Sequence, residues 1–169
     1  MPHRIFRLLT VVWVGSLLTI GYAVAPVLFT SLDRTTAGVV AAQLFRIEGV
    51  LGAVCGILLL GLANVVIRRG GGAYRRLRWL VAGMLICVLV GYFALQPFMN
   101  AMRVAALEAG TDIGHSAYAA RFGMLHGVSS VFYLIESLLG IALVWKLPVG
   151  AEAGSAQQGA CGASGKMAR

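Results

Sequence analysis

Four long apolar stretches constrain the fold of this chain more than any other feature. They cover Leu8–Phe29, Phe45–Ile67, Trp79–Leu95 and Met124–Trp145. A helix needs roughly 20 mostly apolar residues to cross the hydrocarbon of a bilayer, and each stretch supplies close to that number. With 59% hydrophobic and 12% charged residues among 169, the chain has about half the charge of an average soluble domain. We therefore expect an all-α membrane protein, a four-transmembrane-helix antiparallel bundle.

The connecting segments complete this expected architecture. The segment TSLDRTTAG (30–38) is a short polar turn between the first two spans. Residues 97–109 are expected to form a short external helix between spans 3 and 4. Residues 1–147 then form the transmembrane domain, and the Gly-, Ala- and Ser-rich residues 148–169 a disordered cytoplasmic tail. No internal repeat of useful length is apparent, so an inverted-repeat transporter gains no support.

The distribution of positive charge predicts the orientation. The loop RRGGGAYRRLR (68–78) holds five arginines, and placing it with both termini in the cytoplasm puts ten of the 14 Lys and Arg there. This satisfies the positive-inside rule, so we expect a multi-pass protein of a bacterial inner (plasma) membrane with cytoplasmic N- and C-termini. Because the cations group by loop, the expected partner is the lipid bilayer and not a nucleic acid. A homo-oligomer is compatible with this arrangement.

The first apolar stretch is interpreted as a retained membrane anchor. Its apolar run is longer than the roughly 7–15 residues of a signal-peptide core. A proline, Pro26, also follows the small-residue triplet at 23–25, where a cleavage site would lie.

Small residues at helical spacing predict which faces of the spans meet, because helices in lipid approach closely along such stripes. The stripes expected to pack are Gly15, Thr19, Tyr22 and Pro26 in the first span, Gly49, Gly52, Cys55, Gly56 and Ala63 in the second, and Gly83, Cys87 and Gly91 in the third. The cysteines are interpreted as small packing residues.

The fourth span carries its polar residues on one face. Projected at about 100° per residue, the polar positions from His126 to Gly140 share an arc of roughly 140°. Alternating helix directions bring polar residues of the other spans to a similar outer level. The sequence therefore predicts a polar cavity that opens outward, lined by Tyr22, Arg46, Glu48, Gln96, His126, Ser129, Tyr133 and Glu136.

Glu136 is the most unusual of these residues. It lies ten residues before Lys146, or about 15 Å along a helix, close to the middle of the hydrocarbon. Because a buried charge is costly, we expect Glu136 to be neutral or linked to water, with a hydrogen bond to Tyr133 or to a hydroxyl such as that of Thr19. Such a group either carries a proton or cation, or only joins two helices. By contrast, Arg46 and Glu48 are expected near the headgroups, where charge costs little.

Sequence signatures of enzymes and cofactor sites are absent. The chain has no glycine-rich nucleotide loop, HExxH, CxxC or GxSxG, so we expect no enzymatic activity, no cofactor and no metal site. His126 is the one histidine within the spans, whereas haem ligation by two histidines needs a second at similar depth.

Three segments resemble the transmembrane protein 205-like family, four-span membrane proteins of unknown function. They are GYAVAPVLFTSLDRTTAGVVAAQLF (21–45), GYFALQPFMNAMR (91–103) and FGMLHGVSSVFYLIESLLGIALV (122–144). The resemblance implies a four-helix membrane domain with no established reaction. The motif positions that it carries over are Pro26, Phe29, Gly38, Phe45, Gln96, Pro97, His126, Gly127 and Ser129.

The sequence therefore favours a non-enzymatic integral membrane protein with a small transport-related, binding or accessory role and no assigned substrate. Two alternatives stay open. One is a proton-coupled or cation carrier that uses Glu136, and the other is a redox protein with haem or quinone near His126.

Overall fold

The computed structural model describes residues 2–147, and every regular element in that range is a helix. In order these are α1 (Pro2–Thr19), η1 (Ile20–Val24), α2 (Ala25–Ser31), α3 (Arg34–Arg68), α4 (Tyr74–Leu89), η2 (Val90–Leu95), α5 (Gln96–Glu108), η3 (Ile113–His115) and α6 (Ala119–Trp145). The predicted all-α architecture is confirmed for this range. The tail predicted at 148–169 lies outside the described residues.

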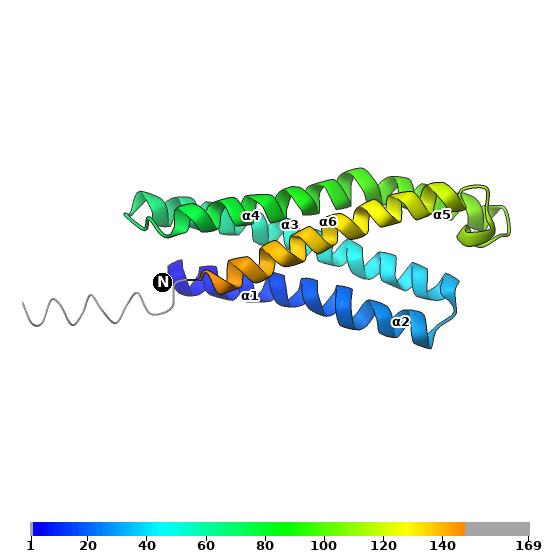
Figure 1. Cartoon of the computed structure of the whole chain (residues 1–169), viewed down its shortest axis with the longest axis horizontal. Coiled ribbons are helices and arrows are strands. Elements are labelled where there is room, and N and C mark those ends of the chain that lie inside the picture. The colour runs from blue at the N-terminus through cyan, green and yellow to red at the C-terminus, as the bar shows by residue number, and fades with distance from the viewer. Residues whose placement is uncertain (1, 148–169) are drawn as a thin grey trace, which may run out of the picture.

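All of these elements except η3, which lies in the connection before α6, join into four long helical rods (Figure 1). The rods His3–Ser31, Arg34–Arg68, Tyr74–Glu108 and Ala119–Trp145 are long and apolar enough to cross a membrane. The prediction of four helices of membrane-spanning length and apolarity is thereby confirmed within residues 2–147. The segment predicted as an external helix is α5, and it continues α4 and η2 without a break.

Two prolines mark the same irregularity in the first and third rods. Pro26 lies in the first turn of α2, and Pro97 lies in the first turn of α5. Each follows a π-helical turn, η1 or η2, at whose end a backbone N–H donates to the carbonyl five residues earlier. Proline has no N–H to offer the preceding turn, and a local π turn is one way for a membrane helix to pass such a residue unbroken.

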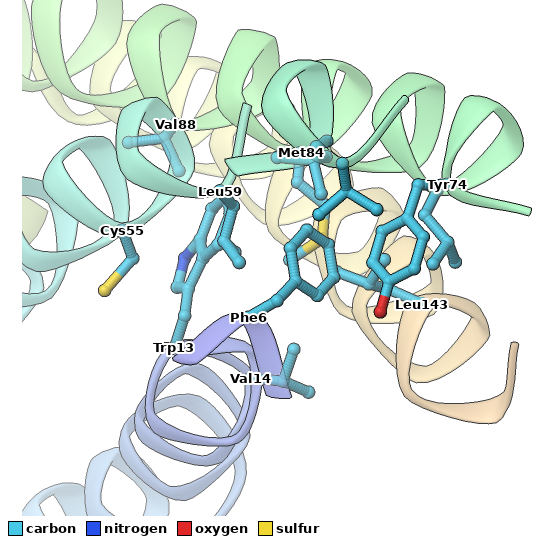
Figure 2. Close-up of a cluster of buried hydrophobic side chains, with 13 residues drawn as sticks. Phe6, Trp13, Val14, Cys55, Leu59, Tyr74, Met84, Val88 and Leu143 are labelled. Carbon is cyan, nitrogen blue, oxygen red and sulfur yellow. The ribbon is translucent and has the colours of Figure 1, made fainter. Parts of the chain in front are cut away.

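The hydrophobic core lies toward one end of the bundle. Figure 1 shows the start of α1, the turn between α3 and α4, and the end of α6 at this end, which we call the arginine end after Arg68, Arg69, Arg75, Arg76 and Arg78. The buried side chains come from α1, α3, α4 and α6, as Figure 2 shows for Phe6, Trp13, Leu59, Met84 and Leu143. These four helices therefore close the arginine end.

The other end, which we call the cavity end, is built differently. There α2 with the first turns of α3 diverges from α5 with the first turns of α6 (Figure 1). Within the described residues, α2 contacts only η1 and α3. The bundle is consequently tight at the arginine end and open at the cavity end.

Glycines of the second and fourth rods receive the large side chains of the first and third. A Cβ at Gly52 would meet the side chains of Trp13 and Val88, and one at Gly140 would meet Val14 and Met84. The predicted packing along α3 fits this arrangement. The predicted packing stripe of the first span is wrong at Gly15, which has no neighbour within 4 Å, and at Thr19, which is exposed, whereas Tyr22 does reach α6 through its hydrogen bond to Ser137. α1 instead packs through its bulky face, which includes Phe6, Trp13 and Leu17.

Candidate functional site

A cavity of about 820 Å³ occupies the cavity end. Seven of the eight predicted cavity residues line it: Tyr22, Glu48, Gln96, His126, Ser129, Tyr133 and Glu136. Arg46 does not line it and is exposed on α3. Among the motif positions of the family resemblance, Phe29, Gly38 and Phe45 also line the cavity, whereas Pro26, Pro97 and Gly127 do not. The residues thus gather from every rod at one place, and their role there stays a prediction.

Two carboxyl groups, Glu48 and Glu136, line the deep part of the cavity. Each side chain is only 4% exposed, and among residues 2–147 the Oε1 atom of each has no hydrogen-bond partner. Glu48 was expected near the lipid headgroups, where a charge costs little, and its burial inside the bundle does not fit that expectation. A buried polar atom without a partner costs roughly 1–3 kcal/mol, so this pair is expensive to keep inside the bundle.

Tyr133 stands beside these carboxyls and is held by α1. Its hydroxyl donates to the Leu17 carbonyl at 2.6 Å, and its ring meets Phe45 edge-on at 5.4 Å between centroids. The hydrogen bond predicted between Tyr133 and Glu136 is therefore wrong, because the Leu17 carbonyl takes the hydroxyl. Gly21 leaves room for this ring, since a Cβ there would overlap it.

Tyr22 reaches from η1 to the same face of α6. Its hydroxyl donates to Ser137 Oγ at 3.2 Å, and Ser137 in turn donates to the Tyr133 carbonyl at 2.8 Å. Tyr22, Tyr133 and Ser137 thus tie the first rod to the fourth next to Glu136. The Glu136 side chain lines the cavity, and its Oε1 atom has no hydrogen-bond partner among the described residues.

Charged residues that the sequence did not single out line the outer part of the cavity. They are Arg34, Arg103 and Asp112. The Arg103 guanidinium lies 5.7 Å from the centroid of the Phe122 ring, and His126 stacks on the same ring at 6.1 Å. Arg34 is 14 residues from Glu48 on α3, or about 21 Å along the helix. Arg34 is therefore well separated from Glu48.

Asp112 shapes the loop that borders this mouth. Its carboxylate accepts hydrogen bonds from the backbone N–H groups of Gly114 and His115 and lies 2.6 Å from His115 Nδ1. The hydrogen bond from the His115 ring holds the pKa of the Asp112 carboxyl below its usual value. Asp112 is therefore a charged anchor for η3.

Tyr92 and Cys87 also line the cavity and were missed as site residues. Tyr92 follows Gly91 just as Tyr22 follows Gly21. This shared Gly-Tyr pair could have identified Tyr92 as a cavity residue from the sequence. Arg103 lies seven residues, or about two helical turns, beyond Gln96 on α5, so helical spacing pointed to it as well.

Metal or haem ligation finds few ligands in the described part of the chain. No group of three or more His, Cys, Asp or Glu in residues 2–147 is placed to hold a metal ion. His126 is exposed, and no second histidine lines the cavity. Cys55 and Cys87 are buried and free.

More than half of the chain matches a known protein family. Residues 8–108 match the domain of unknown function DUF4149. The chain belongs to the DUF4149 family. The matched region runs from α1 to the end of α5 and includes Glu48, whereas Glu136 on α6 lies beyond it. No curated protein and no solved structure matches this DUF4149 protein.

Proposed function

We propose that this DUF4149 protein is a non-enzymatic membrane protein that binds a small molecule or ion in its cavity, in a transport-related or accessory role. The carrying observation is the pair of buried carboxyls, each with an unpartnered oxygen, on the wall of an 820 Å³ cavity. Ionisable groups inside membrane spans are rare and typically mark ion, proton or ligand sites. The volume is also typical of small-molecule pockets, which run from about 300 to 1,000 Å³.

The proposal includes a membrane arrangement. The four rods cross a bacterial inner membrane as an antiparallel bundle, with the arginine end in the cytoplasm and the cavity open to the other side. The arginine-rich turn supports this orientation. The third rod has 35 residues, or about 52 Å, against about 30 Å of hydrocarbon. This excess length supports an external position for α5, and the LHGxS motif supports a relationship to the transmembrane protein 205-like family.

A proton-coupled or cation carrier is the second candidate. The depth of Glu136 in its rod favours it. A carrier also has to open toward the arginine end, which the packed core of Phe6, Leu77 and Leu143 closes in this conformation. Binding is therefore the better-supported function. A haem or quinone protein is the least supported, because His126 is exposed and stacks on Phe122.

The proposal is tested with dicyclohexylcarbodiimide, an apolar reagent that modifies protonated carboxyls in apolar surroundings. We expect mass spectrometry of the purified protein in dodecyl maltoside to find the label on Glu48 and Glu136. Each label should vanish in the corresponding variant, E48Q or E136Q, and persist in E108Q, which changes an exposed carboxylate that does not line the cavity. If both glutamates react only after unfolding in SDS, they are packing groups and the proposed binding site does not exist.

A further inference from the structure

Two short stretches of this chain have similar, though not identical, counterparts further along the sequence. GYAVAP (21–26) is followed by GYFALQP (91–97), and FRIEGVLG (45–52) by YLIESLLG (133–140). These matches are too short to overturn the expectation that the chain holds no internal repeat of useful length, but they mark corresponding positions in its two halves. The two patterns lie 18 residues apart in the first half and 35 in the second.

The repeated patterns occupy equivalent places in two halves of the bundle. The first pattern spans the π turns, η1 in residues 2–68 and η2 in residues 74–145, and the second lies in α3 and α6. Each half thus consists of a rod with a π turn followed by a long helix that bears a buried glutamate. Both halves start at the arginine end (Figure 1), as in a parallel repeat.

Contacts between the halves repeat in the same way. Tyr22 of the first half bonds to Ser137, the residue after Glu136. Tyr92 of the second half packs on Gly49, the residue after Glu48, because a Cβ on that glycine would lie 3.0 Å from its ring. Each tyrosine therefore reaches the residue that follows the other half's glutamate.

The two halves meet at equivalent residues. Phe45 and Tyr133 open the two copies of the second pattern, and their rings contact each other edge-on. Val14 and Met84 each lie seven residues before the repeated Gly-Tyr pair, and both pack around the site of Gly140. The contact between Phe45 and Tyr133 therefore joins equivalent positions of the two halves.

We propose that Glu48 and Glu136 are the equivalent halves of a single site that binds one organic ammonium ion. This inference rests on the proposed binding function and specifies its ligand class. Each carboxyl supplies a negative charge when it loses its proton to the medium as the cation binds, and the aromatic side chains of Tyr22, Phe45, Tyr92 and Tyr133 line the same cavity. Carboxylates and aromatic faces together are what a bulky ammonium group prefers.

A metal ion or an anion fits the residues that line the cavity less well than an organic ammonium ion does. A calcium-like ion takes six or more oxygen ligands, and residues 2–147 offer no group of three ligating side chains. An anion would be repelled by the deep carboxyls. Arg34 and Arg103 line the outer part of the cavity, and Arg34 lies about 21 Å from Glu48 along α3. Arg34 is therefore too far along its helix to neutralise Glu48.

Equilibrium dialysis of radiolabelled benzyltrimethylammonium against the protein in dodecyl maltoside tests the proposal. We expect one ion bound per chain, and no displacement by the uncharged isostere 2,2-dimethylpropylbenzene. E48Q and E136Q should each weaken binding by a similar factor of roughly ten or more, because each substitution removes a negative charge that attracts the cation at short range in a site of low dielectric constant. The double variant should not bind, and E108Q should bind as the unaltered protein does.

Several outcomes would overturn the proposal. Two ions per chain would mean two separate sites. If E136Q loses ammonium binding while E48Q binds fully, the two glutamates are not equivalent halves of one site. The proposed binding function would still stand in that case. If the folded, unaltered protein does not bind the ion, the ligand class is wrong, and carbodiimide labelling then decides whether the proposed function survives. E48D and E136D, which keep the charge, together with size-exclusion chromatography, separate lost binding from lost folding.

Discussion

Gly21 is expected to be the glycine of the first rod that tolerates substitution least. A Cβ at this position would overlap the ring of Tyr133 and lie 2.7 Å from its hydroxyl oxygen. In Gly21→Ala the ring therefore has to leave its place, and both its hydrogen bond to Leu17 and its edge contact with Phe45 are lost. The cost comes from these two contacts.

The magnitude follows from the two contacts. Hydrogen bonds between membrane helices contribute about 0.6 kcal/mol on average and at most about 1.7, and an aromatic pair contributes about 0.5–1.5 kcal/mol. The loss is therefore about 1–3 kcal/mol. Replacing Gly by Ala in a helix returns up to about 1 kcal/mol, which makes the net change of Gly21→Ala small and hard to interpret alone.

Gly15→Ala supplies the matched control. Gly15 lies in the same rod and has nothing within 4 Å of the place that an added methyl group would take. Gly15→Ala therefore gains the higher helix propensity of alanine without displacing a neighbouring side chain. We expect Gly21→Ala to be about 1–3 kcal/mol less stable than Gly15→Ala when unfolding is followed by circular dichroism as SDS is added to dodecyl maltoside micelles. Equal stability of the two variants would refute the reasoning. In a Tyr133→Ala background the difference should disappear, as a double-mutant cycle requires.

Two further predictions concern helix packing and capping. Gly140→Leu should destabilise the bundle by about 1–3 kcal/mol in the same SDS titration, since a Cβ there already lies within 3.2–3.3 Å of side chains from α1 and α4; Gly127→Leu, with open space around it, should change little, and equal effects would contradict the described contacts. At Asp33, the hydrogen bond from the Thr36 N–H, 2.8 Å long, lowers the pKa of the carboxyl from its usual 3.8. A depressed folded-state pKa means that this stabilisation is complete above the unfolded-state pKa and is lost as the pH falls through the folded value. Thermal unfolding between pH 6 and 2.5 should therefore show a steeper loss of stability for the native chain than for Asp33→Asn, and parallel curves would show that the cap does not titrate.

The spans and the gathering of polar residues could be predicted from the sequence. Apolar length alone locates four membrane helices, and the stripe on the fourth span from His126 to Glu136 follows from helical periodicity. These signals are local, and they depend on the residues of one helix at a time. For the same reason they placed most of the cavity lining correctly without showing which side chains touch.

Other features depend on contacts between helices and could not be derived in this way. The first span was expected to pack through Gly15 and Thr19, but its partners α3 and α6 already carry glycines, so α1 contributes its large side chains instead. Glu48 was expected near the headgroups because depth was counted from the ends of the stretches, whereas α3 extends back to Arg34 and leaves Glu48 well inside the helix.

The uneven distribution of the core has a consequence for how the molecule fluctuates. Segments with few buried contacts open locally at low free energy, while the best-packed segments open only when the whole fold does. The side chains around Leu59, Leu77 and Leu143 are buried at the arginine end, whereas α2 touches only η1 and α3 among the described elements. The cavity end can therefore open locally at low free energy while the arginine end stays assembled, and the gap between the diverging helices is where a ligand of the proposed site would exchange.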